Sequence, residues 1–352
     1  MTEVAETFTL GDIRVGPGDA ARGTLMRFTL AGSQELSIPL IVLNGKREGP
    51  TLLLIAACHG REVSDVGALL DALAQMDPTE MSGRVIAIPV GNPIPVQLGT
   101  YISPYDDVDV ASLIAMPPNR GGTASQRIAA AIQDVIAISD YVIDLHAHPQ
   151  LSVPLVLTAR AMAPDEKARE EYMRFASAFG LPLVEQHRPC SRTYATQLGK
   201  PGINPELAGD HMMLEGNTSV GTRGILNCAR VIGILPGEPE PQEIEGLPPL
   251  DGEYGLILLR INEGGFYKIH HDVGEFLREG ERVATVFDHY GDVREEVKMP
   301  ADGYLGSWLP GYLTQTWAVS EGDDIAYIIK PLAPGETPPG EAPGDHPGSD
   351  RA

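Results

Sequence analysis

Apolar runs that alternate with helical periodicity constrain the fold of this chain more than any other sequence feature. Residues 52–57, Leu-Leu-Leu-Ile-Ala-Ala, are continuously apolar, as expected of a strand that is covered on both faces. Val66, Leu69, Leu70 and Leu73 then follow at the spacing of a helix. Strands that alternate with helices in this way predict an α/β fold with a doubly wound, mainly parallel or mixed sheet.

The alternation continues along the chain. Before it, two short β segments are expected at residues 25–30 and 38–43. Thr123 and Gln126 have the spacing of a capping box, which predicts a helix that buries residues up to Ile136. Further strands are expected at residues 85–90, 141–145, 153–158 and 212–215, and a further helix at 166–179.

The length of 352 residues favours two domains and a tail. We expect an α/β domain over residues 1–245, ending in a linker rich in Pro, Glu and Gly at 236–249. Residues 246–330 consist of short β runs separated by Gly and Asp, which predicts a small, barrel-like β domain. The Pro- and Gly-rich residues 331–352 are predicted to be a disordered tail.

Acidic side chains outnumber basic ones in this chain. Forty-eight Asp and Glu residues against 26 Lys and Arg residues give a net charge of −22 at pH 7. Nucleic acids and anionic membranes bind positively charged surfaces, so the composition argues against both as partners. No uninterrupted apolar stretch reaches the roughly 18 residues expected of a membrane span.

The cysteines indicate the compartment. Cys58, Cys190 and Cys228 are too few and too scattered for a disulfide framework. The first residues also lack the basic and apolar regions of a signal peptide. Both observations predict a cytoplasmic protein, and the sequence leaves open whether it forms a homo-oligomer.

Two of the buried runs are followed by residues that bind metals. His59-Gly60-Arg61-Glu62 comes just after the run 52–57, and His146 ends the run 141–145. Ligands of open α/β sheets bind beyond the carboxyl ends of strands, so these side chains are expected to meet there. Two imidazoles and one carboxylate form the ligand set of a catalytic zinc site with one open position. We therefore predict one Zn²⁺ per chain, bound by His59, Glu62 and His146.

Each of these residues also has an interpretation without a metal. A strand-end histidine can bond backbone groups, and a glutamate is favourable at the positive end of a helix, so His-x-x-Glu alone is a weak signal. The spacing of three places His59 and Glu62 on one face of a helical turn, and His146 after a second strand favours the metal. Asp144 is a candidate for orienting a ligand imidazole. His148 competes with His146 as ligand and ranks second, because His146 directly ends the apolar run.

A hydrolytic zinc site also needs a carboxylate that moves protons. Zinc lowers the pKa of bound water towards about 7, and a general base takes the water proton and passes it to the leaving amine. Glu215 is the predicted general base, because it ends the apolar run that starts at Met212 and precedes Gly216-Asn217, where the backbone can turn tightly. An ordinary strand-end glutamate is the alternative.

Several of these segments together resemble one known family. The similarity is to the succinylglutamate desuccinylase/aspartoacylase family of the zinc carboxypeptidase superfamily, and it covers most of residues 35–330. The segments that carry it are Gly49-Pro50-Thr51 to His59-Gly60-Arg61-Glu62, Asp144-Leu145-His146, Met213-Leu214-Glu215-Gly216, Gly264-Gly265-Phe266 and Met299-Pro300-Ala301-Asp302-Gly303.

The resemblance implies a fold of zinc-carboxypeptidase type and an amide hydrolysis. By position, His59, Glu62 and His146 would bind zinc, and Glu215 would act as general base and acid. The substrate would be a small N-acylated amino acid or a similar compound.

One region departs from the family pattern. Relatives carry an Arg and then Asp-Leu-Asn-Arg between the first and third ligands, and these residues hold a substrate carboxylate and help to stabilise the oxyanion. The best match here is Tyr101 followed by residues 109–112, Asp-Val-Ala-Ser, which lack both guanidinium groups and the amide. Either another arginine has taken over, with Arg192 favoured over Arg120, or the substrate lacks that carboxylate.

The C-terminal β segments resemble biotinyl- and lipoyl-type barrels. A carrier domain of that type needs a lysine at an exposed hairpin tip, but the expected hairpin at residues 289–292 contains none, and Lys298 falls on the next strand. A structural role that shapes access to the site is therefore predicted. His270-His271-Asp272 could bind a metal, but a solvated loop is the favoured interpretation.

Three functions follow from these observations. The leading prediction is a zinc-dependent amidohydrolase, a deacylase of small N-acyl substrates. An esterase or carboxypeptidase on the same scaffold is one alternative. A metal-retaining binding protein with weak or no catalysis is another, suggested by the missing Asn-Arg pair, although a binding protein has no use for a proton-shuttling glutamate.

Overall fold

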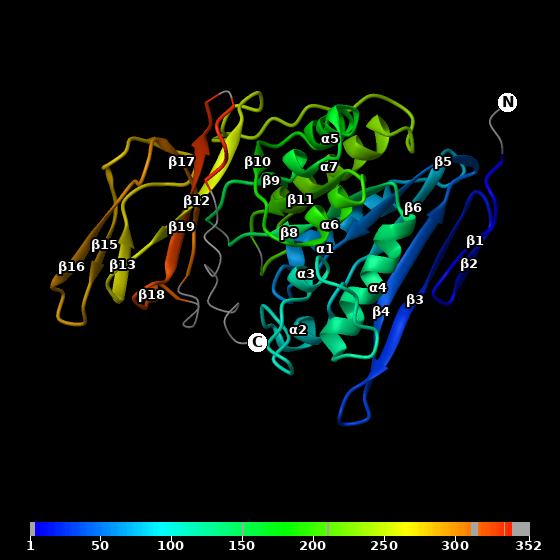
Figure 1. The fold of residues 1–352 in the computed structure, drawn as a ribbon, viewed down its shortest axis with the longest axis horizontal. Coiled ribbons are helices and arrows are strands. Elements are labelled where there is room, and N and C mark those ends of the chain that lie inside the picture. The colour runs from blue at the N-terminus through cyan, green and yellow to red at the C-terminus, as the bar shows by residue number, and fades with distance from the viewer. Residues whose placement is uncertain (1–3, 150, 210, 311–315, 334, 340–352) are drawn as a thin grey trace.

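The structure is a computed structural model that describes residues 4–149, 151–209, 211–310, 316–333 and 335–339. Helices pack on both faces of a large mixed sheet, and a smaller antiparallel sheet lies beyond one end of it (Figure 1). This arrangement confirms the doubly wound α/β fold with a β-rich C-terminal region that the sequence predicts.

Thirteen of the described strands form the large sheet. Across the sheet they are β14 (Phe276–Leu277), β17 (Gly303–Trp308), β19 (Asp324–Pro331), β12 (Tyr254–Arg260), β10 (Leu183–Glu185), β9 (Leu155–Thr158), β11 (Gly202–Leu207), β7 (Tyr141–Asp144), β5 (Arg47–Ile55), β6 (Ser82–Ile88), β4 (Glu35–Asn44) and β3 (Asp19–Thr29), with β8 (His146–Ala147) also paired to β11. The neighbours β11, β7, β5 and β6 are parallel, so their carboxyl ends meet at one edge.

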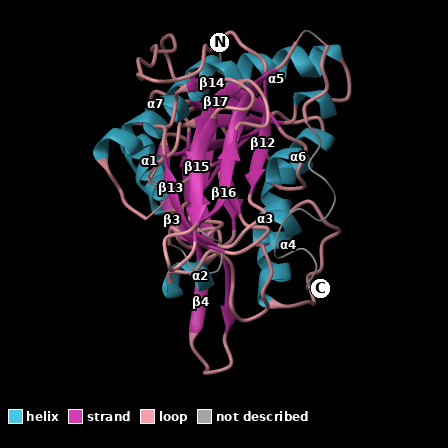
Figure 2. Cartoon of the chain, turned by 90° about the vertical axis from the view of Figure 1, so that its left-hand side faces the viewer, coloured by secondary structure: helices cyan, strands magenta, loops and turns pink. Residues whose placement is uncertain are grey.

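Two layers of helices cover this sheet. α1 (Val63–Ala74) and α7 (Glu215–Val231) lie on one side, and α4 (Ala124–Ile138) and α6 (Ser191–Gln197) on the other (Figure 2). Successive residues of β5 point to opposite faces, so Leu54 enters the core beneath α1 and α7 while Leu53 enters the core beneath α4. The remaining described helices are α2 (Pro93–Leu98), α3 (Val110–Leu113), α5 (Glu166–Ala178) and the 3₁₀ helix η1 (Arg160–Met162).

The predicted start of α4 is confirmed. The Thr123 hydroxyl accepts a hydrogen bond from the Gln126 backbone N–H, and the Gln126 side chain accepts one from the Thr123 N–H at 3.0 Å. The capping box satisfies two N–H groups that the first helical turn leaves without partners.

The prediction of a strand at residues 212–215 is wrong, because α7 begins at Glu215 and the side chains of Met212 to Leu214 are exposed. Small residues take the place of large apolar ones in α7, so the sequence lacks the apolar spacing typical of a helix. An added Cβ at Gly221 would lie 2.7 Å from Ala68 of α1, and one at Gly224 would lie 2.3 Å from the Phe179 ring. The first half of α7 therefore packs closely with few large apolar side chains.

The C-terminal region is built onto the large sheet. β12 pairs in parallel with β10, and β19 and β17 continue from it. The separate antiparallel sheet contains β16 (Val293–Lys298), β15 (Arg282–Phe287), β13 (Gly265–Ile269) and β18 (Ala318–Val319), while β1 (Phe8–Leu10) and β2 (Ile13–Val15) form a hairpin. The boundaries predicted at residues 245 and 330 stay predictions.

The predicted tail begins as an ordered segment. β19 extends to Pro331, and the Leu332 N–H donates to the Glu253 carbonyl at 2.8 Å. Residues 340–352 lie outside the described residues. None of the helices in the described part of the chain combines the length and apolarity needed to cross a lipid bilayer.

Candidate active site

The loop from β5 to α1 presents His59 and Glu62. After β5, the chain turns at Ala57, whose φ of 49° lies in the left-handed region. The buried Asp65 carboxylate, in the first turn of α1, accepts the Ala57 N–H at 2.9 Å. This bond ties the start of α1 to the turn and fixes the loop between them.

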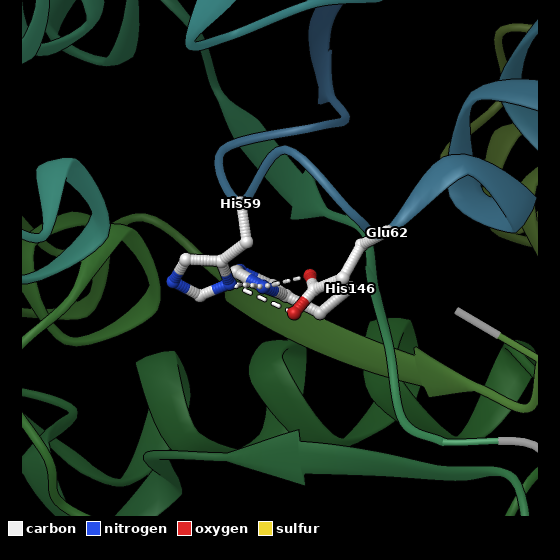
Figure 3. A group of neighbouring side chains, drawn as sticks. All are labelled: His59, Glu62 and His146. Carbon is white, nitrogen blue, oxygen red and sulfur yellow. Dashed lines mark hydrogen bonds and ion pairs between the residues drawn. The ribbon is translucent and has the colours of Figure 1, made fainter. Parts of the chain in front are cut away.

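The His59, Glu62 and His146 side chains converge in a buried cluster (Figure 3). The Glu62 Oε1 atom lies 2.9 Å from His59 Nδ1, and Oε2 lies 3.0 Å from His146 Nδ1. The two Nδ1 atoms are 3.2 Å apart. Each side chain thus turns one ligand atom to the same point, and all these atoms lie within 4.8 Å of one another.

Carboxylates hold the outer nitrogens of both imidazoles. His59 Nε2 lies 3.2 Å from Asp109 Oδ1, and His146 Nε2 lies 3.3 Å from Asp144 Oδ2. The Ser191 hydroxyl donates in turn to Asp144. Metal-binding histidines commonly have such a carboxylate behind the ring, which fixes the tautomer and orientation. Two nitrogen donors and one carboxylate, held in this way, fit a divalent metal ion.

The charges of the cluster depend on one another. Burial opposes the charged form of His59, but the Glu62 and Asp109 carboxylates outweigh it and raise the His59 pKa to about 9. Burial likewise opposes the charged forms of His146 and Glu62. Nevertheless, Asp144 and Glu62 raise the His146 pKa well above its usual value, and the two imidazoles lower the Glu62 pKa. A divalent metal must therefore displace protons from the imidazoles at neutral pH.

The cluster lies in a cavity of about 230 Å³. This volume is below the roughly 300 Å³ at which pockets for drug-sized ligands begin, so it suits a small compound. Ala111 and Ser112 line the cavity at the positions where the family resemblance implies an Asn-Arg pair. The Tyr101 ring stacks on His59 at a centroid distance of 3.9 Å. The segment from 109 to 112 thus brings no guanidinium to the site.

Glu206 is a cavity carboxylate that the sequence analysis missed. It lies on β11 opposite His146 of β8, is 8% exposed, and its Oε2 atom lies 3.2 Å from His148 Nε2. The available signal was the alternation of residues 202–207, Gly-Ile-Asn-Pro-Glu-Leu, in which Ile203 and Leu207 are core residues on one face. Pro205 obscures this strand, since proline is rare inside sheets.

Glu215 does not take the predicted position. It is the exposed first residue of α7 and is not among the described residues that line the cavity. We expected Glu215 to end a strand at the sheet edge that holds His59 and His146, and this expectation is wrong. The strand that ends beside His146 is β11, and Glu215 begins α7. His148 contacts Glu206 and Tyr327 and lies outside the three-residue cluster of ligand candidates.

The arginines differ in their surroundings. Arg192 is 1% exposed, lines the cavity and donates to Asn204 Oδ1 at 2.6 Å. Arg120 is exposed, pairs with Asp134 and is not among the described lining residues. Arg188, which the sequence analysis did not consider, also lines the cavity and lies 3.4 Å from Asp109.

Comparisons with known proteins find similarity to one family. Residues 48–232 match the model of the succinylglutamate desuccinylase/aspartoacylase catalytic domain. An N-α-acetyl-L-2,4-diaminobutyric acid deacetylase of Halomonas elongata is 25% identical over 306 residues, which cover 83% of this chain and 85% of the relative.

Solved structures have the same fold. A succinylglutamate desuccinylase/aspartoacylase from Rhodobacter sphaeroides superposes with a TM-score of 0.78 at 25% identity, covering 94% of this chain and 100% of the other. The ectoine utilization protein EutE (DoeB) of Ruegeria pomeroyi superposes with a TM-score of 0.76 at 22% identity, covering 89% and 97%.

We predict that the purified protein contains one divalent metal ion per chain, and that His59→Ala and His146→Ala each remove it. The reason is that both imidazoles turn Nδ1 to Glu62. Elemental analysis of protein purified without added metal measures the content. His148→Ala is the matched control and keeps the metal, because His148 contacts Glu206 instead. Unchanged metal in the first two variants would contradict the ligand assignment.

We predict that metal affinity rises with pH throughout the range from about pH 6 to about pH 9, because protons compete with the metal for both imidazoles. In the metal-free protein the His59 pKa is raised to about 9 and the His146 pKa is raised well above its usual value. A raised pKa means that the proton competes with the metal below that pKa, and each displaced proton changes the affinity by up to about tenfold per pH unit. Chelator competition from about pH 6 to about pH 9 measures the slope. An affinity that levels off near the usual histidine pKa of about 6.5 would contradict this coupling.

Proposed function

Because the chain belongs to the succinylglutamate desuccinylase/aspartoacylase family, we propose that it is a zinc-dependent deacylase of small N-acylated amino acids or amines. The observation that carries the proposal is a buried carboxylate, Glu206, in the same cavity as the His59, Glu62 and His146 cluster. The reaction adds the oxygen of water to the acyl carbon, breaks the amide C–N bond and returns a proton to the amine nitrogen.

Zinc is the proposed metal, held by His59, Glu62 and His146. Two imidazole nitrogens and one carboxylate are a donor set that suits zinc and leaves a position open. When bound, zinc acts as a Lewis acid that polarises the carbonyl group and lowers the pKa of water towards about 7. Asp109 and Asp144 hold the two imidazoles in the orientation that this binding requires.

Glu206 is the proposed general base and acid. Its carboxylate faces the cavity and is not part of the three-residue cluster, so it is available to accept a proton from water. The same carboxyl group then donates that proton to the nitrogen of the leaving amine. His148, at 3.2 Å, holds the carboxylate in position. A carboxylate of this type favours catalysis over the alternative of a metal-retaining binding protein.

Arg192 is proposed to contact an anionic group of the substrate or the developing oxyanion. It is buried at the cavity, and its position is fixed by Asn204 Oδ1 and by the Gln186 carbonyl at 2.8 Å. A preorganised charged donor in a water-poor site stabilises developing negative charge more strongly than it would in water. Arg192 thus supplies a guanidinium to a cavity whose 109–112 segment has none.

We also propose that the enzyme works in the cytoplasm. Cys58, Cys190 and Cys228 are free thiols, and Cys58 and Cys228 are buried. Unpaired cysteines suit a reducing compartment. The proposed partner is the small N-acyl substrate.

We predict that Glu206→Gln keeps the fold and the metal but lowers kcat on the order of a hundredfold or more, because the amide cannot take the proton from water. Steady-state deacylation of the best N-acyl substrate measures the effect. Glu215→Gln is the matched control and keeps near-wild-type turnover, since Glu215 is exposed on α7. The opposite result would assign the proton transfer to Glu215.

We predict that Arg192→Lys lowers kcat/KM by roughly a hundredfold, because an ammonium group cannot reproduce the planar, multidentate guanidinium. Arg120→Lys, on the surface, leaves kcat/KM unchanged. Circular dichroism verifies that the buried substitution still folds. Full activity in a folded Arg192→Lys protein would contradict a contact between the Arg192 guanidinium and the substrate.

A further inference from the structure

One wall of the cavity is apolar and comes from the C-terminal region. Leu256 and Leu258 of β12 and Leu309, just after β17, line the cavity and are only partly buried by the protein itself. Tyr327 of β19 is the Cα partner of Leu258 in the sheet and lines the same cavity. We call Leu256, Leu258 and Leu309 the leucine wall.

The leucine wall lies next to the residues that contact Glu206. The Tyr327 ring packs against His148 at a centroid distance of 4.6 Å, and its hydroxyl is hydrogen-bonded to His148 Nδ1. His148 Nε2 lies 3.2 Å from Glu206, the group proposed to protonate the leaving nitrogen. Leu258 and Tyr327 are neighbours. With Glu206 in its proposed role, we therefore place the amine half of the substrate, rather than its acyl half, beside the leucine wall.

The charges of the cavity are suited to one carboxylate on the amine half of the substrate. Among the described residues, the polar partners of the Arg192 guanidinium are the neutral Asn204 and Gln186, so its charge lacks a counter-ion. Asn204 lies two residues before Glu206 on the same face of β11. Arg188, by contrast, faces the Asp109 carboxylate. A buried cation without a counter-ion favours an anionic ligand.

Building on the proposed deacylase function, we propose that the substrates are N-acyl α-amino acids with an uncharged, apolar side chain. The α-carboxylate binds Arg192, and the side chain packs on the leucine wall. A second carboxylate or an ammonium group at the end of the side chain would be desolvated against leucines without a partner, which is strongly unfavourable. The preference thus differs from that for a diaminobutyric acid derivative, the substrate in the name of the Halomonas elongata relative.

The test compares kcat/KM of the metal-loaded enzyme for N-acetyl derivatives of L-alanine, L-norvaline and L-norleucine with those of L-glutamate and L-2,4-diaminobutyrate. We expect about a fourfold gain per added methylene, and a preference for norleucine over glutamate of roughly a hundredfold. A second series lengthens the acyl chain on L-alanine. A gain confined to that series would place the acyl group on the leucine wall and overturn the proposal.

A variant pair tests the contact itself. Leu258→Asn lowers the ratio of norleucine to alanine activity by roughly tenfold, because the amide exposes a polar group to the side chain. Leu250→Asn, an exposed leucine that lines a different cavity, leaves that ratio unchanged. An unchanged ratio in the Leu258→Asn enzyme would contradict the leucine wall as the side-chain site.

The two levels of the proposal fail in different ways. Preferred hydrolysis of the glutamate or diaminobutyrate derivative would overturn the apolar specificity and leave the deacylase function intact. Absence of hydrolysis for every acyl compound would overturn the deacylase function. In that case, thermal stabilisation of the metal-loaded protein by N-acetyl-L-norleucine rather than N-acetyl-L-glutamate still measures the specificity of the cavity.

Discussion

The contact of the Glu62 carboxylate with His59 and His146 is the interaction on which the site depends. Burying a carboxylate and two imidazoles is unfavourable unless each group has a partner. Here Glu62 contacts both rings, and Asp109 and Asp144 hold their outer nitrogens. The contributing segments are far apart in sequence, so the parallel sheet has to bring their ends to one edge before the cluster can form.

The proximity of His59, Glu62 and His146 could be predicted from sequence because these residues follow strong local signals. His59 and His146 come at the ends of apolar runs, and the order of parallel strands places such ends together. Glu206 could not be found in the same way, since Pro205 interrupts the strand pattern and only the pairing of β11 with β8 brings Glu206 beside His146. The helix α7 was missed for a different reason. Its closely packed glycines interrupt the apolar pattern of a helix, so the short apolar run before it was interpreted as a strand.

The missing family arginines show a second limit of sequence reasoning. The sequence establishes that residues 109–112 carry no guanidinium, but not which segment supplies one. Arg188 and Arg192 both follow β10, and their position opposite Asp109 and Asn204 depends on how the loop after that strand folds over the cavity. In the role that we propose for Arg192, a residue distant in sequence supplies the positive charge that residues 109–112 lack.

The C-terminal region lines the cavity and contacts residues to which we assign a role in the reaction. Its strands join the large sheet through the pairing of β12 with β10. Tyr327 of this region is hydrogen-bonded to His148, and His148 in turn contacts Glu206. Leu258, beside Tyr327, lines the same cavity. In the proposed reaction, the selection of the substrate side chain and the placement of Glu206 thus both depend on two neighbouring strands, β12 and β19. Substitutions in β12 can therefore change specificity while the His59, Glu62 and His146 cluster, held by other strands, stays intact.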